Sequence, residues 1–497
     1  MALTGMETTG LLALAPLIVV IGVAILVVIV DMIRPGDDRL AGVVGTVGLI
    51  VALAMVVGVG SGDVPVMGGT YIRDPLTALL DAIFIVVAIL TILTAPAYLR
   101  PRGLPLGEFT ATLLFAIAGA MVIAGARDLL ILFLGLELLV LPGYMLAGYA
   151  KRDGYSTEGA IKYFLLGSFS SAIFLFGLAY TWGYTGTTNI SAVADALGQV
   201  TAISPALAMG LALLTVGVAF KIAAVPFHYW TPDAYQGSPT PVTGYLSVGP
   251  KVAAFALILR LFVEALGPLQ GDIVNVVIVL STLTMTLGNL VAITQDNIKR
   301  MLAYSSIAHT GYMLVGLAAY GAAPAGSPAA EQGLQGLLFY SVAYAFMNIG
   351  AFAVVTALQG VPGVTSQIAS FSGLGRRAPV AGAVMTLFLL SLTGIPPTAG
   401  FFAKALVILS AVEAGGWASV LAVIAVLNAA IAAFYYLRVV VYMYMRDAPG
   451  DAKPLSDSWP LRLGLGLAAV ATILFGIIPG LILPTTQAAA QVLLLAP

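Results

Sequence analysis

The chain has no cysteine and only two histidines among its 497 residues. Without cysteine it cannot form a disulfide, cannot hold an iron–sulfur cluster through thiolates, and offers no thiol nucleophile. His228 and His309 are too few for a haem or metal site built from several histidines. Since no nucleotide-binding loop is recognisable either, the sequence points away from redox chemistry within this chain.

Charged residues are also scarce, at 9% of the chain, while 60% of the residues are hydrophobic and the mean hydropathy is +1.04. A soluble domain has about a quarter of its residues charged. The net charge of −1 argues against a nucleic-acid partner. Hydrophobic runs of about 20 residues recur, each long enough to cross about 30 Å of hydrocarbon. The runs lack the alternation of barrel strands, so we expect an all-α polytopic membrane protein.

The hydrophobic runs predict fourteen membrane spans, and no linker indicates a second domain, so residues 1–497 are expected to form a single transmembrane domain. The first run lacks a basic start and a small-residue cleavage site, so we expect it to be retained rather than removed as a signal peptide. The predicted spans are 11–32, 40–60, 75–97, 109–126, 128–150, 158–183, 203–225, 240–264, 272–294, 301–320, 334–359, 379–411, 417–445 and 462–484.

Basic residues in the connections divide into two unequal sets. One alternate set of loops carries only Arg73 and Arg127. By the positive-inside rule the richer set is cytoplasmic, which places both termini on the opposite face. The richer set contains Arg34, Arg39, Arg100, Arg102, Lys151, Arg152, Lys299, Arg300, Arg376, Arg377, Arg446, Lys453 and Arg462.

A few charges remain inside the predicted spans. A charge at the bilayer centre costs about 3 kcal/mol on insertion scales, so such residues are functional candidates by default. Glu137 lies nine residues after Asp128, or about 13 Å along a helix, which places it near the midplane. It is expected to carry a proton or to pair with a lysine; an inert structural ion pair is the alternative. The residues inside the spans are Glu137, Lys162, Lys221, Lys251, Arg260, Lys404 and Arg438.

Lys221 lies five residues before a proline in the segment FKIAAVPFHYW. Pro226 has no backbone N–H, so the carbonyl of Ile222 loses its helical partner. A broken helix beside a lysine predicts a polar, hydrated pocket in the middle of the membrane.

Two further lysines adjoin prolines. Lys251 follows Pro250 directly, and Lys404 follows the predicted helix break at Pro396 and Pro397. Burial lowers the pKa of a lysine ammonium in general, so a desolvated lysine can exchange a proton near neutral pH, whereas arginine cannot. Three lysines beside three proline interruptions therefore indicate proton transfer, with snorkelling of the side chains to the surface as the alternative.

The remaining candidates carry weaker signals. Lys162 lies near the cytoplasmic end of its span, where a snorkelling side chain is an equal alternative. His228 follows the first proline break and is a natural proton relay, since histidine titrates near neutral pH. His309 lies among serines and tyrosines and is a possible relay. Arg260 and Arg438 lie towards span ends and are interpreted as anchors or static ion-pair partners.

Three segments together resemble the antiporter-like membrane subunits of respiratory complex I. They are STEGAIKYFLLGSFSSAIFLFG, FKIAAVPFHYWTPDAYQGSPTPVTGYLSVGPKVAAF and NIKRMLAYSSIAHTGYML. The resemblance implies fourteen helices containing two inverted five-helix repeats, helices 4–8 within residues 109–264 and helices 9–13 within residues 272–445. Helices 7 and 12 are then the broken ones.

Within this family, the chain is most similar to the N-type subunit of bacterial NADH–quinone oxidoreductase. It ends soon after the fourteenth span, without the lateral helix of the L-type subunit, and Lys404 stands where the M-type subunit usually has glutamate. The resemblance implies a bacterial cytoplasmic membrane, an M-type neighbour and small K-, J- and A-type neighbours. It implies no cofactor in this chain, with NADH, flavin, iron–sulfur clusters and quinone handled by other subunits.

The resemblance also implies roles for the candidate residues. Glu137 matches the glutamate that pairs with the helix-seven lysine, here Lys221. Lys251 matches the central lysine, with His228 as a relay before it. Lys404 matches the residue at the exit side, and Lys162 matches a family lysine on helix six.

Two other functions remain open from the sequence. A subunit of a multisubunit sodium/proton antiporter, or of a related membrane hydrogenase, shares the same fold and lysines. A structural membrane subunit with inert ion pairs is the alternative from a different class.

Overall fold

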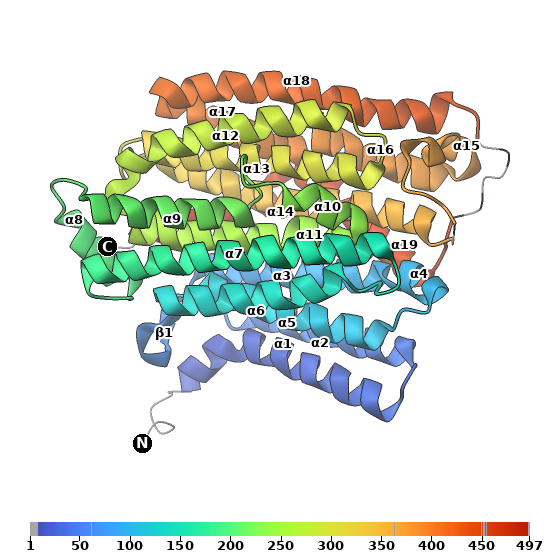
Figure 1. The fold of residues 1–497 in the computed structure, drawn as a ribbon, viewed down its shortest axis with the longest axis horizontal. Coiled ribbons are helices and arrows are strands. Elements are labelled where there is room, and N and C mark those ends of the chain that lie inside the picture. Colours follow the sequence, from blue (N-terminus) through green and yellow to red (C-terminus); the bar gives the residue numbers. More distant parts are fainter. Residues whose placement is uncertain are drawn as a thin grey trace.

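The computed structural model describes residues 8–60, 62–361, 363–448, 450, 453 and 455–495, with side chains from residue 10 onward. Its helices run side by side with roughly parallel axes, from α1 (Thr8–Ile33) and α2 (Asp38–Gly58) at one edge to α18 (Gly416–Met445) at the opposite edge (Figure 1). The fold is an α-helical membrane bundle, as the composition predicted.

Eleven stretches in the described part of the chain are long and apolar enough to cross a membrane. They contain α1, α2, α3 (Pro75–Thr94), α5 (Leu106–Gly125), α6 (Leu129–Ala147), α7 (Gly154–Thr185), α11 (Thr240–Ile258), α12 (Gln270–Ile293), α14 (Pro328–Gln359), α18 and α19 (Trp459–Ile477). Two shorter apolar helices, α9 (Pro205–Lys221) and α16 (Pro379–Thr393), each end at a break. The predicted total of fourteen spans stays a prediction, because it also requires α13 (Ile298–Ala322) and the joining of helices across both breaks.

Both predicted broken helices are confirmed as interruptions. After α9 the chain leaves helical geometry until α10 (Trp230–Gly237), and after α16 it resumes as α17 (Ala399–Ala414). A break at Pro250 was wrong: α11 continues through this proline. Because Pro250 cannot donate to the carbonyl of Leu246, that carbonyl accepts a hydrogen bond from the Tyr235 hydroxyl at 3.1 Å instead.

The two ends of the bundle differ. Figure 1 shows the strand β1 (Val64–Val66), α8 (Ile190–Gly198) and the chain's C-terminus at one end, and α4 (Pro96–Leu99) and α15 (Leu374–Arg377) at the other. The second end carries arginines of the richer basic set, so the helices alternate in direction as the loop charges predicted. Which end faces the cytoplasm stays a prediction.

Several connections contain structure that the sequence did not predict. The connection before α3 forms a hairpin in which β1 pairs with β2 (Tyr71–Arg73) in antiparallel register. α8 lies within the loop at 184–202, and α20 (Leu483–Leu495) follows the last predicted span. Lys299, expected in a loop, is part of α13 and is buried.

The core lies along α11, α13 and α14, whose side chains are buried over most of their length. In contrast, α1, α2 and α18 expose many large apolar side chains. Such an arrangement is expected in hydrocarbon, where apolar side chains face lipid without cost. The helices that carry the candidate lysines border or belong to this buried centre.

Candidate functional site

Threonines from α12 and α13 form hydrogen bonds with the backbone of the first break. Thr310 donates its hydroxyl to the carbonyl of Ile222 at 2.8 Å, and Thr284 accepts from the backbone N–H of Val225 at 3.0 Å. The carbonyl that Pro226 was predicted to leave without a helical partner is therefore satisfied by a side chain 88 residues further on. These bonds keep the backbone beside Lys221 irregular without leaving it unsatisfied.

Lys221 ends α9, and its ammonium donates to the Ser171 hydroxyl of α7 at 2.9 Å. Glu137 lies in the middle of α6, and its Oε1 atom is buried without a hydrogen-bond partner in the described part of the chain. No carboxylate oxygen among the described residues lies within 4.0 Å of the Lys221 ammonium. The structure therefore does not bring the expected pair, Glu137 and Lys221, into direct contact.

Lys251 is buried in the centre of the bundle, 3% exposed, on the unbroken helix α11. Its ammonium donates to both the hydroxyl (2.6 Å) and the backbone carbonyl of Ser306 on α13. The ring of Tyr344, from α14, lies 5.6 Å away. The central lysine thus depends on neutral oxygen acceptors and an aromatic face rather than on a carboxylate.

Lys404 bridges the second break from α17. Its ammonium donates to the carbonyls of Leu392 (3.0 Å) and Thr393 (2.7 Å), in the last turn of α16. These carbonyls are among those that a helix end leaves without an intrahelical partner. The ammonium also lies 4.5 Å from the centre of the Tyr312 ring.

His309 lies on α13 between Ser306, which binds Lys251, and Tyr312, whose ring faces Lys404. Its Nδ1 and Nε2 atoms are 2.6 and 3.1 Å from the hydroxyls of Tyr340 and Tyr436, respectively. The histidine thus has a tyrosine hydroxyl at each ring nitrogen, one helical turn from the residues that contact the two lysines.

Further hydroxyl and amide groups extend this chain of polar side chains. Tyr436 is hydrogen-bonded to Ser305, the residue before the Ser306 that binds Lys251. Asn289 donates to Tyr312, whose ring faces Lys404, and accepts from Tyr435 at 3.0 Å. Hydrogen-bonded polar groups therefore lie near both lysines, around His309 and around Asn289.

The remaining predicted residues lie elsewhere. His228 follows the first break and is buried, and its Nδ1 has no hydrogen-bond partner among the described residues. Lys162 is 42% exposed and forms ion pairs with Glu158 (2.6 Å) and Asp233 (2.8 Å). Asp233 also pairs with Arg300 at 2.6 Å. The structure thus places Lys162 in an ion-pair cluster, and not among the buried lysines.

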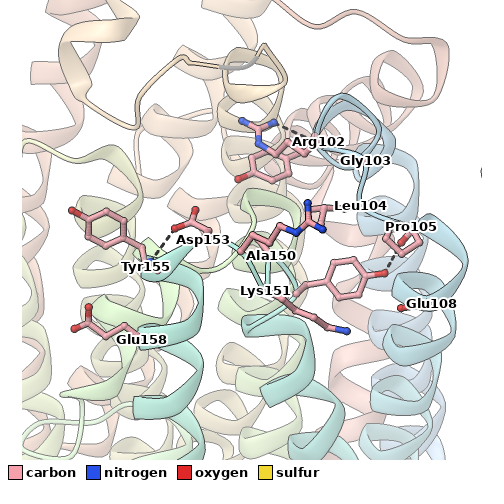
Figure 2. Close-up of a pocket in the computed structure, with 14 residues that line it drawn as sticks. Arg102, Gly103, Leu104, Pro105, Glu108, Ala150, Lys151, Asp153, Tyr155 and Glu158 are labelled. Carbon is pink, nitrogen blue, oxygen red and sulfur yellow. Dashed lines mark hydrogen bonds between the residues drawn. The ribbon is translucent and has the colours of Figure 1, made fainter.

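A surface pocket of about 1240 Å³ lies beside this cluster, at the end of the bundle that carries α4. Figure 2 shows Arg102, Lys151, Asp153 and Glu158 around it. Since Glu158 pairs with Lys162, the pocket connects the aqueous surface with the ion-pair cluster.

A separate network joins arginines to carboxylates. Arg260, which the sequence indicated as a possible static partner, binds Asp74 at 2.7 Å and Glu264 at 2.6 Å, and is fully buried. Arg127 reaches the same glutamate at 2.6 Å. Glu264, like Asp233, was not identified as a candidate by sequence reasoning.

Two other arginines also have fixed partners. Arg73 binds Asp81 at 2.7 Å, with both side chains 1% exposed. Arg438 donates to backbone carbonyls of Ile293 (3.0 Å) and Gln295 at a helix end, as expected of an anchor. Within the described residues, buried arginines have carboxylate partners, whereas the half-buried Lys221 and the buried Lys251 and Lys404 have none.

Comparisons with known proteins agree with this architecture. A family model described as NADH:quinone oxidoreductase/Mrp antiporter, TM, matches residues 126–431. A curated relative from Myxococcus xanthus, NADH-quinone oxidoreductase subunit N, is 43% identical over 451 residues, covering 86% of each chain. The protein of the same name from Trichlorobacter lovleyi is 40% identical over 495 residues, covering 98% of each.

Solved structures give the same result. A chain of respiratory complex I from Thermus thermophilus with bound aureothin aligns with a TM-score of 0.78 and 32% identity, covering 94% of this chain and 98% of that chain. A chain of the Mrp complex from Dietzia aligns with a TM-score of 0.84 at 23% identity, covering 98% of each, which shows a shared fold. With two relatives at 40% identity or more over most of its length, this chain belongs to the NADH-quinone oxidoreductase subunit N family of antiporter-like membrane proteins.

Proposed function

We propose that this chain translocates protons as the N-type membrane-arm subunit of a bacterial NADH:quinone oxidoreductase. The names of its relatives support the complex, and the buried lysines support the proton path. NADH, flavin, iron–sulfur clusters and quinone are assigned to the other subunits, so electron transfer occurs outside this chain. The neighbours are an M-type subunit and small K-, J- and A-type subunits, and both termini lie on the outer face of the cytoplasmic membrane.

One observation carries the proposal: Lys221, Lys251 and Lys404 are held by hydroxyl and carbonyl oxygens, with no carboxylate within 4.0 Å in the described structure. A carboxylate partner stabilises the charged form of a lysine, neutral acceptors stabilise it less, and burial disfavours it. These lysines can therefore lose and regain a proton. A permanently ion-paired side chain is much less suited to this task.

In the proposed repeats, the two broken helices occupy equivalent positions, one in each repeat. We assign residues 109–264 to the first antiporter-like repeat and residues 272–445 to the second. Lys221 ends the first half of one broken helix, and Lys404 follows the break of the other. Glu137 has no carboxylate counterpart on α13, where His309 lies between two tyrosines.

The proposed cycle uses the separation seen between Glu137 and Lys221. When a neighbouring subunit moves the two side chains together, the carboxylate holds Lys221 protonated. When they separate, the Lys221 ammonium binds Ser171 and passes its proton towards Lys251, with His228 as the relay. From Lys251 the proton reaches Lys404 through the polar groups around His309. Lys162 and its ion pairs act at the entry side, next to the surface pocket.

The test uses the assembled complex in sealed vesicles. Glu137→Gln and Lys221→Met are expected to lower the proton gradient formed per NADH oxidised while leaving the amount of assembled complex unchanged. Arg34→Met is the control, because it removes an exposed cation that does not line the surface pocket. Normal proton pumping by both variants would refute the proposal. Loss of assembly with normal pumping per assembled complex would instead indicate a structural subunit with inert charges.

A further inference from the structure

A groove of about 890 Å³ opens between the first turns of α16 and α19. It lies at the end of the bundle that carries α15 (Figure 1). Neither the proposed proton path nor the ion-pair networks use it. Its rim is charged and its wall is apolar, so the groove suits a molecule that has both a charged and an apolar part.

The rim has an excess of positive charge. Two arginines, Arg377 and Arg462, line the groove together with one carboxylate, Asp457, so the arginines carry one positive charge more than this carboxylate balances. Asp457 is paired with Arg462 and lies outside the membrane-spanning segments, where hydrogen bonds from this arginine keep the pKa of the carboxyl below its usual value. The excess charge thus remains across the physiological pH range.

Arg377 is positioned but not saturated. Of the five N–H donors of a guanidinium, one from Nη1 binds the carbonyl of Lys453 at 3.0 Å and one from Nη2 binds the carbonyl of Ser370 at 2.8 Å. Its Nε has no hydrogen-bond partner in the described structure. Two backbone bonds therefore fix the guanidinium at the rim and leave one N–H on each Nη to donate to an anion.

The wall below the rim is apolar. Val380 and Leu465 line it, and Gly466 leaves an open space, since a Cβ at this position would meet nothing within 4 Å. Trp459 begins α19 and is 73% exposed, as is common for tryptophan at a membrane–water interface. An exposed tryptophan at the start of α19 is what we expect where the rim meets lipid headgroups and the wall faces hydrocarbon.

We propose that this groove binds a phospholipid with a net anionic headgroup, whose phosphate contacts Arg377 and Arg462 and whose acyl chain lies along Val380, Leu465 and Gly466. Basic pockets between membrane helices on the cytoplasmic side suit such headgroups. A free phosphate would leave the apolar wall uncovered. A zwitterionic headgroup would bring its own ammonium into a rim that is already positive.

The test uses phosphatidylglycerol with a photoactivatable acyl chain, added to the assembled complex in nanodiscs of phosphatidylcholine. We expect crosslinks on α16 and α19 that unlabelled phosphatidylglycerol removes and additional phosphatidylcholine does not. The double variant Arg377→Gln/Arg462→Gln is expected to lose these crosslinks. Arg376→Gln, which removes an exposed neighbouring arginine paired with Asp447 outside the groove, is expected to retain them.

A steric variant separates lipid binding from effects of charge on folding. Gly466→Phe is expected to fill the groove and remove the crosslinks, while Gly22→Phe, at an equally open glycine on α1, is expected to retain them. The proposal is overturned if the crosslinks persist in both groove variants or if phosphatidylcholine competes equally well. It is also overturned if a segment of a neighbouring subunit is crosslinked in the groove of the unmodified complex.

Discussion

Lys221 donates a hydrogen bond to Ser171 across 2.9 Å, which joins the last residue of α9 to the middle of α7. The relationship matters because a hydroxyl, and not the carboxylate of Glu137, receives the ammonium in this state. A serine hydroxyl stabilises the charged lysine without fixing it as a carboxylate would. The structure thus corresponds to the separated state of the proposed charge-pair switch.

Removing this hydroxyl tests the importance of the contact. Ser171→Ala removes a hydrogen bond to a charged group, worth about 1.5–3 kcal/mol. Since about 1.4 kcal/mol corresponds to tenfold, the balance between the paired and separated states moves by about tenfold or more towards pairing with Glu137. We expect slower proton pumping per NADH oxidised, measured in sealed vesicles. Thr215→Val, which removes a hydroxyl bonded within α9, is expected to pump normally; equal rates in both variants would count against the switch.

His309 offers a second test, because it lies on α13 between the residues that contact Lys251 and Lys404. His309→Phe preserves an aromatic ring but removes both ring nitrogens that contact Tyr340 and Tyr436. We expect proton pumping to fall while the complex still assembles. The control is Tyr320→Phe, since the Tyr320 hydroxyl makes a single long contact of 3.4 Å with the carbonyl of Val263. Unchanged pumping in His309→Phe would show that protons do not pass this histidine.

The helix breaks show how far sequence reasoning reaches. A proline without an N–H predicts that the carbonyl of Ile222 lacks its helical partner, and this is confirmed. The identity of its donor, Thr310, depends on the packing of α13 against the break and leaves no local signal. The same rule was wrong about a break at Pro250, because the Tyr235 hydroxyl satisfies the freed carbonyl and packing keeps α11 helical.

Charges near span ends were harder to interpret than those at the midplane. The sequence predicts a loop position for Lys299. In the structure it is buried and donates to the carbonyls of Gln236 and Ser238, at the end of α10. Asp233 lies within the second of the three segments that carry the family resemblance. Its ion pairs are with Lys162 and Arg300, which are distant in the sequence. Hydropathy shows where a charged residue lies along one helix, whereas the packing of different helices determines which residues its side chain contacts.

The buried arginine network provides a prediction about stability. Asp81→Leu leaves Arg73 buried without its carboxylate, and breaking a buried pair costs about 3–5 kcal/mol. We expect the single variant to lower the thermal stability of the assembled complex and Arg73→Met/Asp81→Leu to recover part of the loss. Pumping per assembled complex should remain normal in both. A double variant less stable than the single one would contradict a static role for this pair.

The most direct test of the account is the number of protons moved per NADH oxidised by Lys251→Met in sealed vesicles. Lys299→Met is the matched control, since both lysines are 3% exposed and donate to neutral oxygens, but Lys299 holds the end of α10. We expect a lower ratio for Lys251→Met and a normal ratio, per assembled complex, for Lys299→Met. A normal ratio in Lys251→Met would contradict proton transfer through the buried lysines.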